Sequence, residues 1–115
     1  MLTVDDKNYI CSLDYAMSII KGKWKSVIIC HLNRSSTRFL ELQRQLPGVS
    51  QKVLTENLKE LEADKIIKKI VFPEVPPRVE YELTETGYKL FEIITLLETW
   101  GKEYIKEFKI NNSPN

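Results

Sequence analysis

Two cysteines and one histidine are the side chains of this chain best suited to covalent or metal chemistry. They are Cys11, Cys30 and His31. A zinc site usually takes four ligands in two spaced pairs, and these three residues supply no second pair. The sequence also contains no glycine-rich phosphate loop and no nucleophile–base motif. We therefore expect no metal site, no cofactor and no enzymatic activity, and we place His31 at the end of a helix.

The two cysteines differ in their sequence surroundings. Cys30 lies within the apolar run VIICHL. Free cysteine is among the most often buried residue types, so Cys30 is expected to be an inert core thiol. Cys11 stands at the start of a predicted amphipathic helix, and a helix N-terminus favours the thiolate form. A structural role and a sensing role both remain open for Cys11. A Cys11–Cys30 disulfide has no support, and a pairing of two subunits through Cys11 fits better.

A second group of polar residues follows the turn at Pro47-Gly48. Ser50 is a favourable N-cap for the next helix, and Val49 can pack against Leu54 across the cap as a hydrophobic staple. Leucines recur at i, i+4 and i+7 along this helix and predict a buried face. These leucines are Leu54, Leu58 and Leu61.

The opposite side of that helix carries residue types that read DNA bases. Gln pairs with adenine, Lys reaches guanine or phosphate, and the Thr methyl touches thymine. The candidate contacts are Ser50, Gln51, Lys52 and Thr55. The alternative is that Ser50 only caps the helix and that the other three are solvated.

The remaining apolar patterns predict the elements that would position these side chains. Helices are expected over 12–20, with Ser12 as the N-cap, over 23–32 and over 35–46. Two β-branched and aromatic strands are expected over 65–72 and 78–83, and a long helix over 85–108. Two helices joined by a turn and followed by a hairpin predict a winged helix-turn-helix. The fold class is thus mainly α with a small antiparallel β-hairpin, α+β. The expected buried stripe of the third helix is Phe39, Leu42 and Leu46.

The stretch PEVPPRVEY joins the two strands and predicts the stiff tip of a wing. Prolines cost little at a hairpin tip and reduce the entropy lost when the tip is held against DNA. Arg78 follows Pro76 and Pro77, and we expect all three at the DNA, with Arg78 on a phosphate or in the minor groove. The alternative for Arg78 is a pair with a nearby carboxylate. Arg38 begins the preceding helix and is expected to contact phosphate, with a solvated arginine as the alternative.

The first and last helices carry more apolar surface than a small domain can bury. Apolar residues cover roughly half the circumference of the last helix, more than the ~100° stripe of a typical surface helix. We expect this excess to form a homodimer interface. Its expected residues are Leu13, Met17 and Ile20 from the first helix and Ile93, Leu96, Trp100 and Tyr104 from the last.

Three separated motifs occur in order along the chain. They are Gly22-Lys23-Trp24, the block from Arg38-Phe39 to Pro47-Gly48-Val49-Ser50, and Pro76-Pro77-Arg78-Val79-Glu80-Tyr81. Together they resemble the HxlR-type winged-helix transcriptional regulators, relatives of the MarR-like repressors. The resemblance implies a homodimer on a palindromic operator, and a thiol at the position of Cys11 that senses quinones, aldehydes or oxidants. Such proteins commonly have glycine where this chain has Lys65, which implies a left-handed backbone there.

Length and composition agree with one soluble domain. The 115 residues predict a single unit over 1–110, with the helix-turn-helix at about 37–63, the wing at about 66–84, the C-terminal dimerisation helix at about 85–108 and a frayed tail at 111–115. No apolar run could span a bilayer, and the absence of a signal peptide favours the cytoplasm.

The charge distribution points to an anionic partner for the middle of the chain. Residues 34–69 carry eight basic and five acidic side chains, which suits double-stranded DNA. The alternative is that these charged side chains are scattered over solvated surfaces and meet no anionic partner. The alternative function is a winged-helix module that binds a protein and makes no direct contact with DNA.

Overall fold

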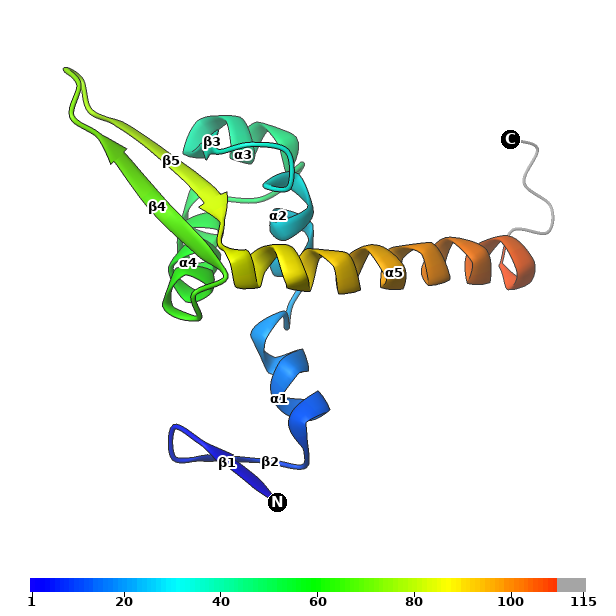
Figure 1. The fold of residues 1–115 in the computed structure, drawn as a ribbon. Coiled ribbons are helices and arrows are strands. Elements are labelled where there is room, and N and C mark those ends of the chain that lie inside the picture. Colours follow the sequence, from blue (N-terminus) through cyan, green and yellow to red (C-terminus); the bar gives the residue numbers. More distant parts are fainter. Residues whose placement is uncertain (110–115) are drawn as a thin grey trace.

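The computed structural model describes residues 1–109, and the tail predicted to fray lies outside them. The elements along the chain are shown in Figure 1. They are β1 (Leu2–Val4), β2 (Lys7–Tyr9), α1 (Ser12–Ile19), α2 (Lys25–His31), β3 (Thr37–Arg38), α3 (Phe39–Gln45), α4 (Gln51–Ala63), β4 (Ile67–Phe72), β5 (Arg78–Leu83) and α5 (Glu85–Phe108). The expected order of helix, helix, helix, turn, helix, hairpin and long helix is confirmed.

The core lies where α2, α3 and α4 meet the base of the β4–β5 hairpin. Ile28 and Ile29 of α2, and Leu32 at its C-cap, are fully buried. The predicted leucine face of α4 is confirmed, because all three of its leucines are buried. Leu42 of α3 and Leu46 at its C-cap are buried as expected, whereas Phe39 is only partly buried and packs against the core.

The sheet holds one strand that the sequence did not predict. Thr37 and Arg38 form the short strand β3, which pairs antiparallel with β5 on the side opposite β4. The sequence predicts a helix over 35–46 and no strand in this segment. Two ladder partners in β5, Tyr81 and Glu80, hold this segment extended instead. Arg38 therefore links the wing to the start of α3.

A second hairpin at the N-terminus was also missed. β1 and β2 pair across a turn at Asp5 and Asp6, whose φ angles are 50° and 63°. Two consecutive positive φ angles match the two-residue turn that suits hairpin twist, but the usual sequence signal is Asn-Gly or Asp-Gly. Tyr9 of β2 packs edge-on against Tyr15 of α1, with ring centroids 5.0 Å apart.

The predicted cap residue is confirmed for α4 and is wrong for α1. Ser50 caps α4, and its hydroxyl accepts a hydrogen bond from the Val53 N–H at 3.1 Å. In α1 the predicted cap Ser12 is the first helical residue, and Cys11 occupies the N-cap position without a side-chain bond. The carboxylate of Asp14 instead accepts the Ile10 N–H at 2.9 Å. This bond holds the chain that enters the helix, so a serine cap is not needed.

The start of α5 is fixed by contacts with Lys65 and Ile66, the two residues that precede β4. Thr84 donates its N–H to the Ile66 carbonyl at 3.0 Å and its hydroxyl to the Lys65 carbonyl at 2.6 Å. Its hydroxyl also caps α5 by accepting the Gly87 N–H at 3.0 Å. A Cβ on Gly87 would lie 2.1 Å from the Ile66 carbonyl oxygen. Only glycine allows this approach, so the junction sets the direction in which α5 leaves the body.

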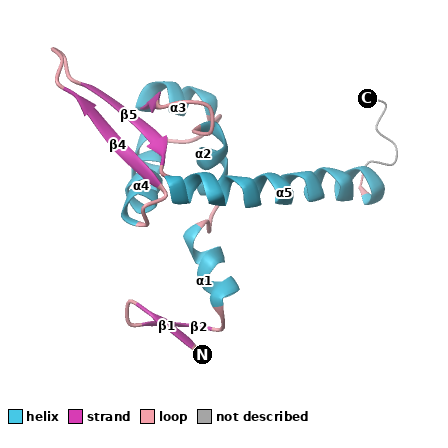
Figure 2. Ribbon diagram, in the orientation of Figure 1, coloured by secondary structure: helices cyan, strands magenta, loops and turns pink. Residues whose placement is uncertain are grey.

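The protomer is an open shape with two projecting arms. Figures 1 and 2 show α5 extending from the body in one direction and α1 with the β1–β2 hairpin in another. The Cα radius of gyration is 16.6 Å, whereas a compact domain of this length has about 13 Å. No helix within residues 1–109 is both long and apolar enough to cross a bilayer.

The expected left-handed residue after α4 is confirmed, because Lys65 has a φ of 63°. A side chain at such a position costs free energy that glycine avoids. We predict that Lys65→Gly raises the free energy of unfolding by up to about 1 kcal/mol. Urea denaturation at fixed protein concentration measures this change.

Asp64 supplies the matched control, because it precedes Lys65 and has an ordinary φ of −83°. Asp64→Gly should lower the free energy of unfolding by about 0.5–1 kcal/mol. Equal effects of the two glycine substitutions would contradict the strain assigned to Lys65.

Candidate nucleic-acid interface

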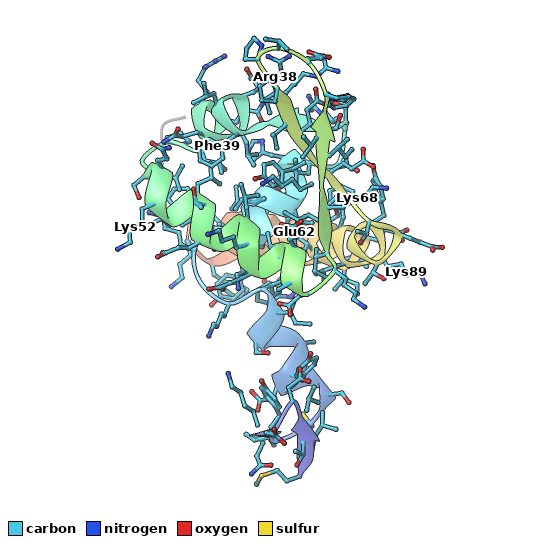
Figure 3. All side chains as sticks on the ribbon, turned by 90° about the vertical axis from the view of Figure 1, so that its left-hand side faces the viewer. Arg38, Phe39, Lys52, Glu62, Lys68 and Lys89 are labelled. Carbon is cyan, nitrogen blue, oxygen red and sulfur yellow. The ribbon has the colours of Figure 1, made fainter. Side chains whose placement is uncertain are left out.

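The first turn of α4 presents its polar side chains to solvent. Ser50, Gln51 and Lys52 are exposed, and Thr55 is half-buried one turn later. Figure 3 shows α4 lying across the face of the body, with Lys52 pointing outward from one end. The structure thus places Ser50, Gln51 and Lys52 together at the start of α4, with Thr55 one turn further along the helix.

This turn offers several donors to a phosphate. A helix N-terminus carries unsatisfied N–H groups and a partial positive charge, and both favour anions. The Ser50 hydroxyl accepts a bond from Val53 and keeps its own proton for donation. Within residues 1–109 no ion pair involves Lys52 or Arg38. Both cations are therefore free to meet an anion.

Arg38 lies between α3 and the wing. It occupies the N-cap position of α3 and is exposed, as predicted for the entry of that helix. A hollow of about 360 Å³ separates the start of α3 from the wing tip. Arg38, Pro76, Pro77 and Arg78 all line it. The predicted contacts of the wing and of α3 therefore lie beside one another.

The guanidinium of Arg78 is held within the wing. One nitrogen lies 3.2 Å from a carboxylate oxygen of Glu74, and Nε lies 3.3 Å from Glu80. The group also stacks over the Phe72 ring, 4.0 Å from its centroid. Nε makes no hydrogen bond, so its approach to Glu80 is an ion pair of poor geometry. The carboxylate pairing left open by the sequence is what the structure shows, and DNA contact by Arg78 stays a prediction.

Glu80 connects this arginine to the body of the protein. Its other oxygen accepts a hydrogen bond from the Ser36 hydroxyl at 2.5 Å, and its backbone pairs with Arg38 across the sheet. On the far strand, Lys68 pairs with Glu82 at 3.1 Å. The wing is thus stiffened by side-chain pairs as well as by its prolines, and sequence reasoning did not identify Ser36 or Glu80 in this role.

The two thiols lie in different surroundings, and the expectation that Cys30 is a core thiol is wrong. Cys11 is exposed at the N-cap of α1. Cys30 is only half-buried, because a cavity of about 850 Å³ between α1, α2 and α5 opens beside it. Burial, and to a smaller extent the Glu98 carboxylate, raises the pKa of the Cys30 thiol. Both effects oppose formation of the reactive thiolate.

The last helix leaves a long apolar stripe uncovered. Leu96 is 72% exposed, Trp100 60% and, on α1, Leu13 68%. Ile93, Tyr104 and Met17 are exposed too, whereas Ile20 is half-buried and packs against the core. Trp100 stacks on Tyr104 with centroids 5.2 Å apart. Sequence reasoning missed the exposed Ile10 and Ile105, which extend the same apolar character along both arms.

His31 is the last residue of α2, as predicted. Residues 1–109 contain no cluster of three or more His, Cys, Asp or Glu side chains that could hold a metal ion.

Fold and surface together define a winged helix-turn-helix transcriptional regulator, and comparison with known proteins gives its family. The HxlR-like helix-turn-helix family model matches residues 19–109. The chain belongs to this family. It is 46% identical over 102 residues to the uncharacterised HTH-type transcriptional regulator YtcD of Bacillus subtilis (strain 168), covering 89% of this chain and 81% of YtcD.

Solved structures agree with this assignment. The redox regulator HypR in its oxidised form matches with a TM-score of 0.77 and 40% identity, over 81% of this chain and 96% of HypR. A structure from Porphyromonas gingivalis W83, described as a MarR-family transcriptional regulator, matches with a TM-score of 0.78 and 43% identity. That match covers 84% of this chain and 95% of the other. The expected kinship with MarR-like regulators is thereby confirmed.

The contrast between the thiols predicts their order of alkylation. Cys11 should react with iodoacetamide faster than Cys30 at about pH 8, because Cys30 is half-buried and its pKa is raised. Peptide mass spectrometry over a time course measures both rates. Unfolding the protein in urea is the control and should bring the two rates together. Equal rates in the folded protein would contradict the assigned environments.

Proposed function

We propose that this protein is a homodimer that binds a palindromic operator through the first turn of α4 and through the wing. The observation that carries the proposal is the first turn of α4, where Ser50, Gln51 and Lys52 are exposed at a helix N-terminus. Its cation Lys52 has no partner in an ion pair among residues 1–109. An exposed, unpaired cation at a helix N-terminus suits a phosphate or a guanine edge.

Each residue of the turn has a separate role in this proposal. Gln51 and Lys52 extend from α4 and read base edges, and Thr55 offers its methyl group to thymine. Ser50 donates to a phosphate while it caps the helix. Arg38 contacts the backbone on the side of the wing. Pro76 and Pro77 hold the wing tip, and Arg78 exchanges its carboxylate partners for a phosphate when DNA arrives.

The dimer is supported by the apolar stripe along α5 and α1. Contiguous apolar surface of this extent marks an interface in soluble proteins. A two-fold axis through paired arms would place one α4 on each side of the axis, and such dimers read half-sites one helical turn, about 34 Å, apart. A palindromic operator would mirror that symmetry.

A response to oxidants or thiol-reactive electrophiles through Cys11 forms part of the proposal. The support is the exposure of this thiol on the arm that carries the apolar stripe, and the similarity to HypR, which is a redox regulator. Modification at the start of α1 would change how that arm packs in the dimer. A Cys11 that alkylates no faster than Cys30 would remove this support.

We predict that Lys52→Ala weakens DNA binding and lowers its salt dependence. Loss of one phosphate-contacting cation should reduce the slope of log affinity against log salt by about 1. Fluorescence anisotropy with a duplex from the region upstream of its own gene, over a series of salt concentrations, measures both quantities.

Lys109→Ala is the matched control, because Lys109 is an exposed lysine just beyond the end of α5, far along the chain from α4. Its slope should equal that of the wild type. If neither protein binds DNA at low salt and a partner protein co-purifies instead, the interaction-module alternative replaces this proposal. The exposed Glu56, on the same face as Lys52, is the feature that would favour that outcome.

We further predict that Leu96→Glu converts the dimer into a monomer. A charge placed on the apolar stripe must be desolvated when two stripes pack together, which is unfavourable without a partner charge. Sedimentation velocity over a concentration series measures the change. Lys102→Glu on the polar side of the same helix should leave the dimer intact. A wild-type protein that sediments as a monomer at all concentrations would contradict the dimer itself.

A further inference from the structure

Lys25 is the one charged residue buried in the described part of the chain, at 3% exposure. It is the first residue of α2. Burial of an ammonium group removes it from water at a large cost. The start of a helix adds a further cost, because the helix dipole is positive there. A lysine at this place is stable only if a negative group meets it.

That group is Glu60 of α4, whose carboxylate forms an ion pair with the Lys25 ammonium. The Glu60 side chain remains 58% exposed, so only the lysine end of the pair is buried. The hydrogen bond from Lys25, and then the charges of Lys25 and Lys21, hold the pKa of Glu60 below its usual value. The pair joins α2 to α4 from the far end of α4, near its C-terminus.

The pair acts on α4 differently from the leucine face. Apolar contacts hold the helix against the core, but they resist rotation and sliding only through shape. An ion pair with a hydrogen bond has a direction, so it favours one rotational setting of α4. Glu60 lies eight residues, or about 12 Å of helix, from Lys52. A rotation of α4 about its axis turns both ends of the helix. The setting that the ion pair favours at Glu60 therefore also sets the direction of the turn that would meet the bases.

We propose that Lys25 is a positioning residue for DNA recognition, which sets the orientation of α4 through Glu60. This proposal rests on the proposed function of α4 as the reading helix. Replacing a buried ion pair by apolar groups is often neutral for stability. The pair should therefore matter more for sequence discrimination than for folding.

The test compares two duplexes. One is enriched from a random-sequence pool by the wild-type protein, and the other is a scrambled version of the first. Lys25→Met should fold, and its affinity for the enriched duplex should fall roughly tenfold. Its affinity for the scrambled duplex and its salt slope should stay unchanged, since no phosphate contact is removed. Glu60→Gln should act in the same direction.

A charge exchange gives the sharper arm of the experiment. Glu60→Lys alone places two ammonium groups together and should lose discrimination. The double variant Lys25→Glu with Glu60→Lys restores opposite charges and puts the acid at the helix start, where the dipole favours it. It should recover most of the discrimination at an unchanged net charge. Lys23→Met and Glu62→Gln are the controls, because both residues are exposed neighbours outside the pair.

Thermal denaturation of every variant distinguishes a change in the orientation of α4 from a loss of folded protein. Glu60→Gln leaves the buried Lys25 ammonium without its partner, which lowers stability. If Glu60→Gln does not fold, Lys25→Met carries the test, because it leaves only the exposed Glu60 carboxylate unpaired. Three outcomes would each overturn the proposal. The variants could lose affinity equally on both duplexes, Lys25→Met and Glu60→Gln could keep wild-type discrimination, or the charge exchange could fail to restore discrimination. A wild-type protein that enriches no duplex would overturn the proposed function as well. Intact wild-type discrimination with unaffected variants would overturn the role of Lys25 alone.

Discussion

The packing of the leucine face of α4 onto α2 is the contact on which the rest of the structure depends. Leu54 and Leu61 are fully buried and belong to the same core cluster as the buried isoleucines of α2. Each buried leucine side chain contributes about 1.5–3 kcal/mol relative to an exposed one. Because this face is turned inward, the polar first turn of the same helix must face outward. The core therefore decides which surface of the protein can meet a ligand.

From the end of α4 the chain is guided by a few backbone contacts. The left-handed Lys65 turns the chain into β4, and Thr84 binds the carbonyl of Ile66 as β5 returns. Gly87 then lets the first turn of α5 approach that same carbonyl. Wing and long helix thus leave from a single junction. Their directions are coupled to α4, although neither covers its leading turn.

The sequence predicted the features that depend on periodicity, and it missed those that depend on partners distant along the chain. The leucines of α4 and the cap at Ser50 follow from local pattern and were found. The left-handed backbone at Lys65 was expected from the resemblance to HxlR-type regulators. β3 exists only because Tyr81 and Glu80 lie beside it, and two residues carry no strand signal of their own. The turn at Asp5-Asp6 lacks the glycine that usually marks it. The Lys25–Glu60 pair was missed as well, since a lysine at the start of an apolar helix gives no sign of burial.

The internal pairing of Arg78 changes the electric field of the wing. Its charge is matched by Glu74 and exceeded when Glu80 is counted, while the intervening residues of the tip are uncharged. Seen from beyond the Debye length of about 8 Å, the tip is weakly negative, and it does not attract a polyanion. Under the proposed function, long-range attraction would come from cations outside the tip, such as Lys52 and Arg38, which form no ion pair within residues 1–109. In the proposed complex, a wing built in this way would add contacts after docking and contribute little to the rate of encounter.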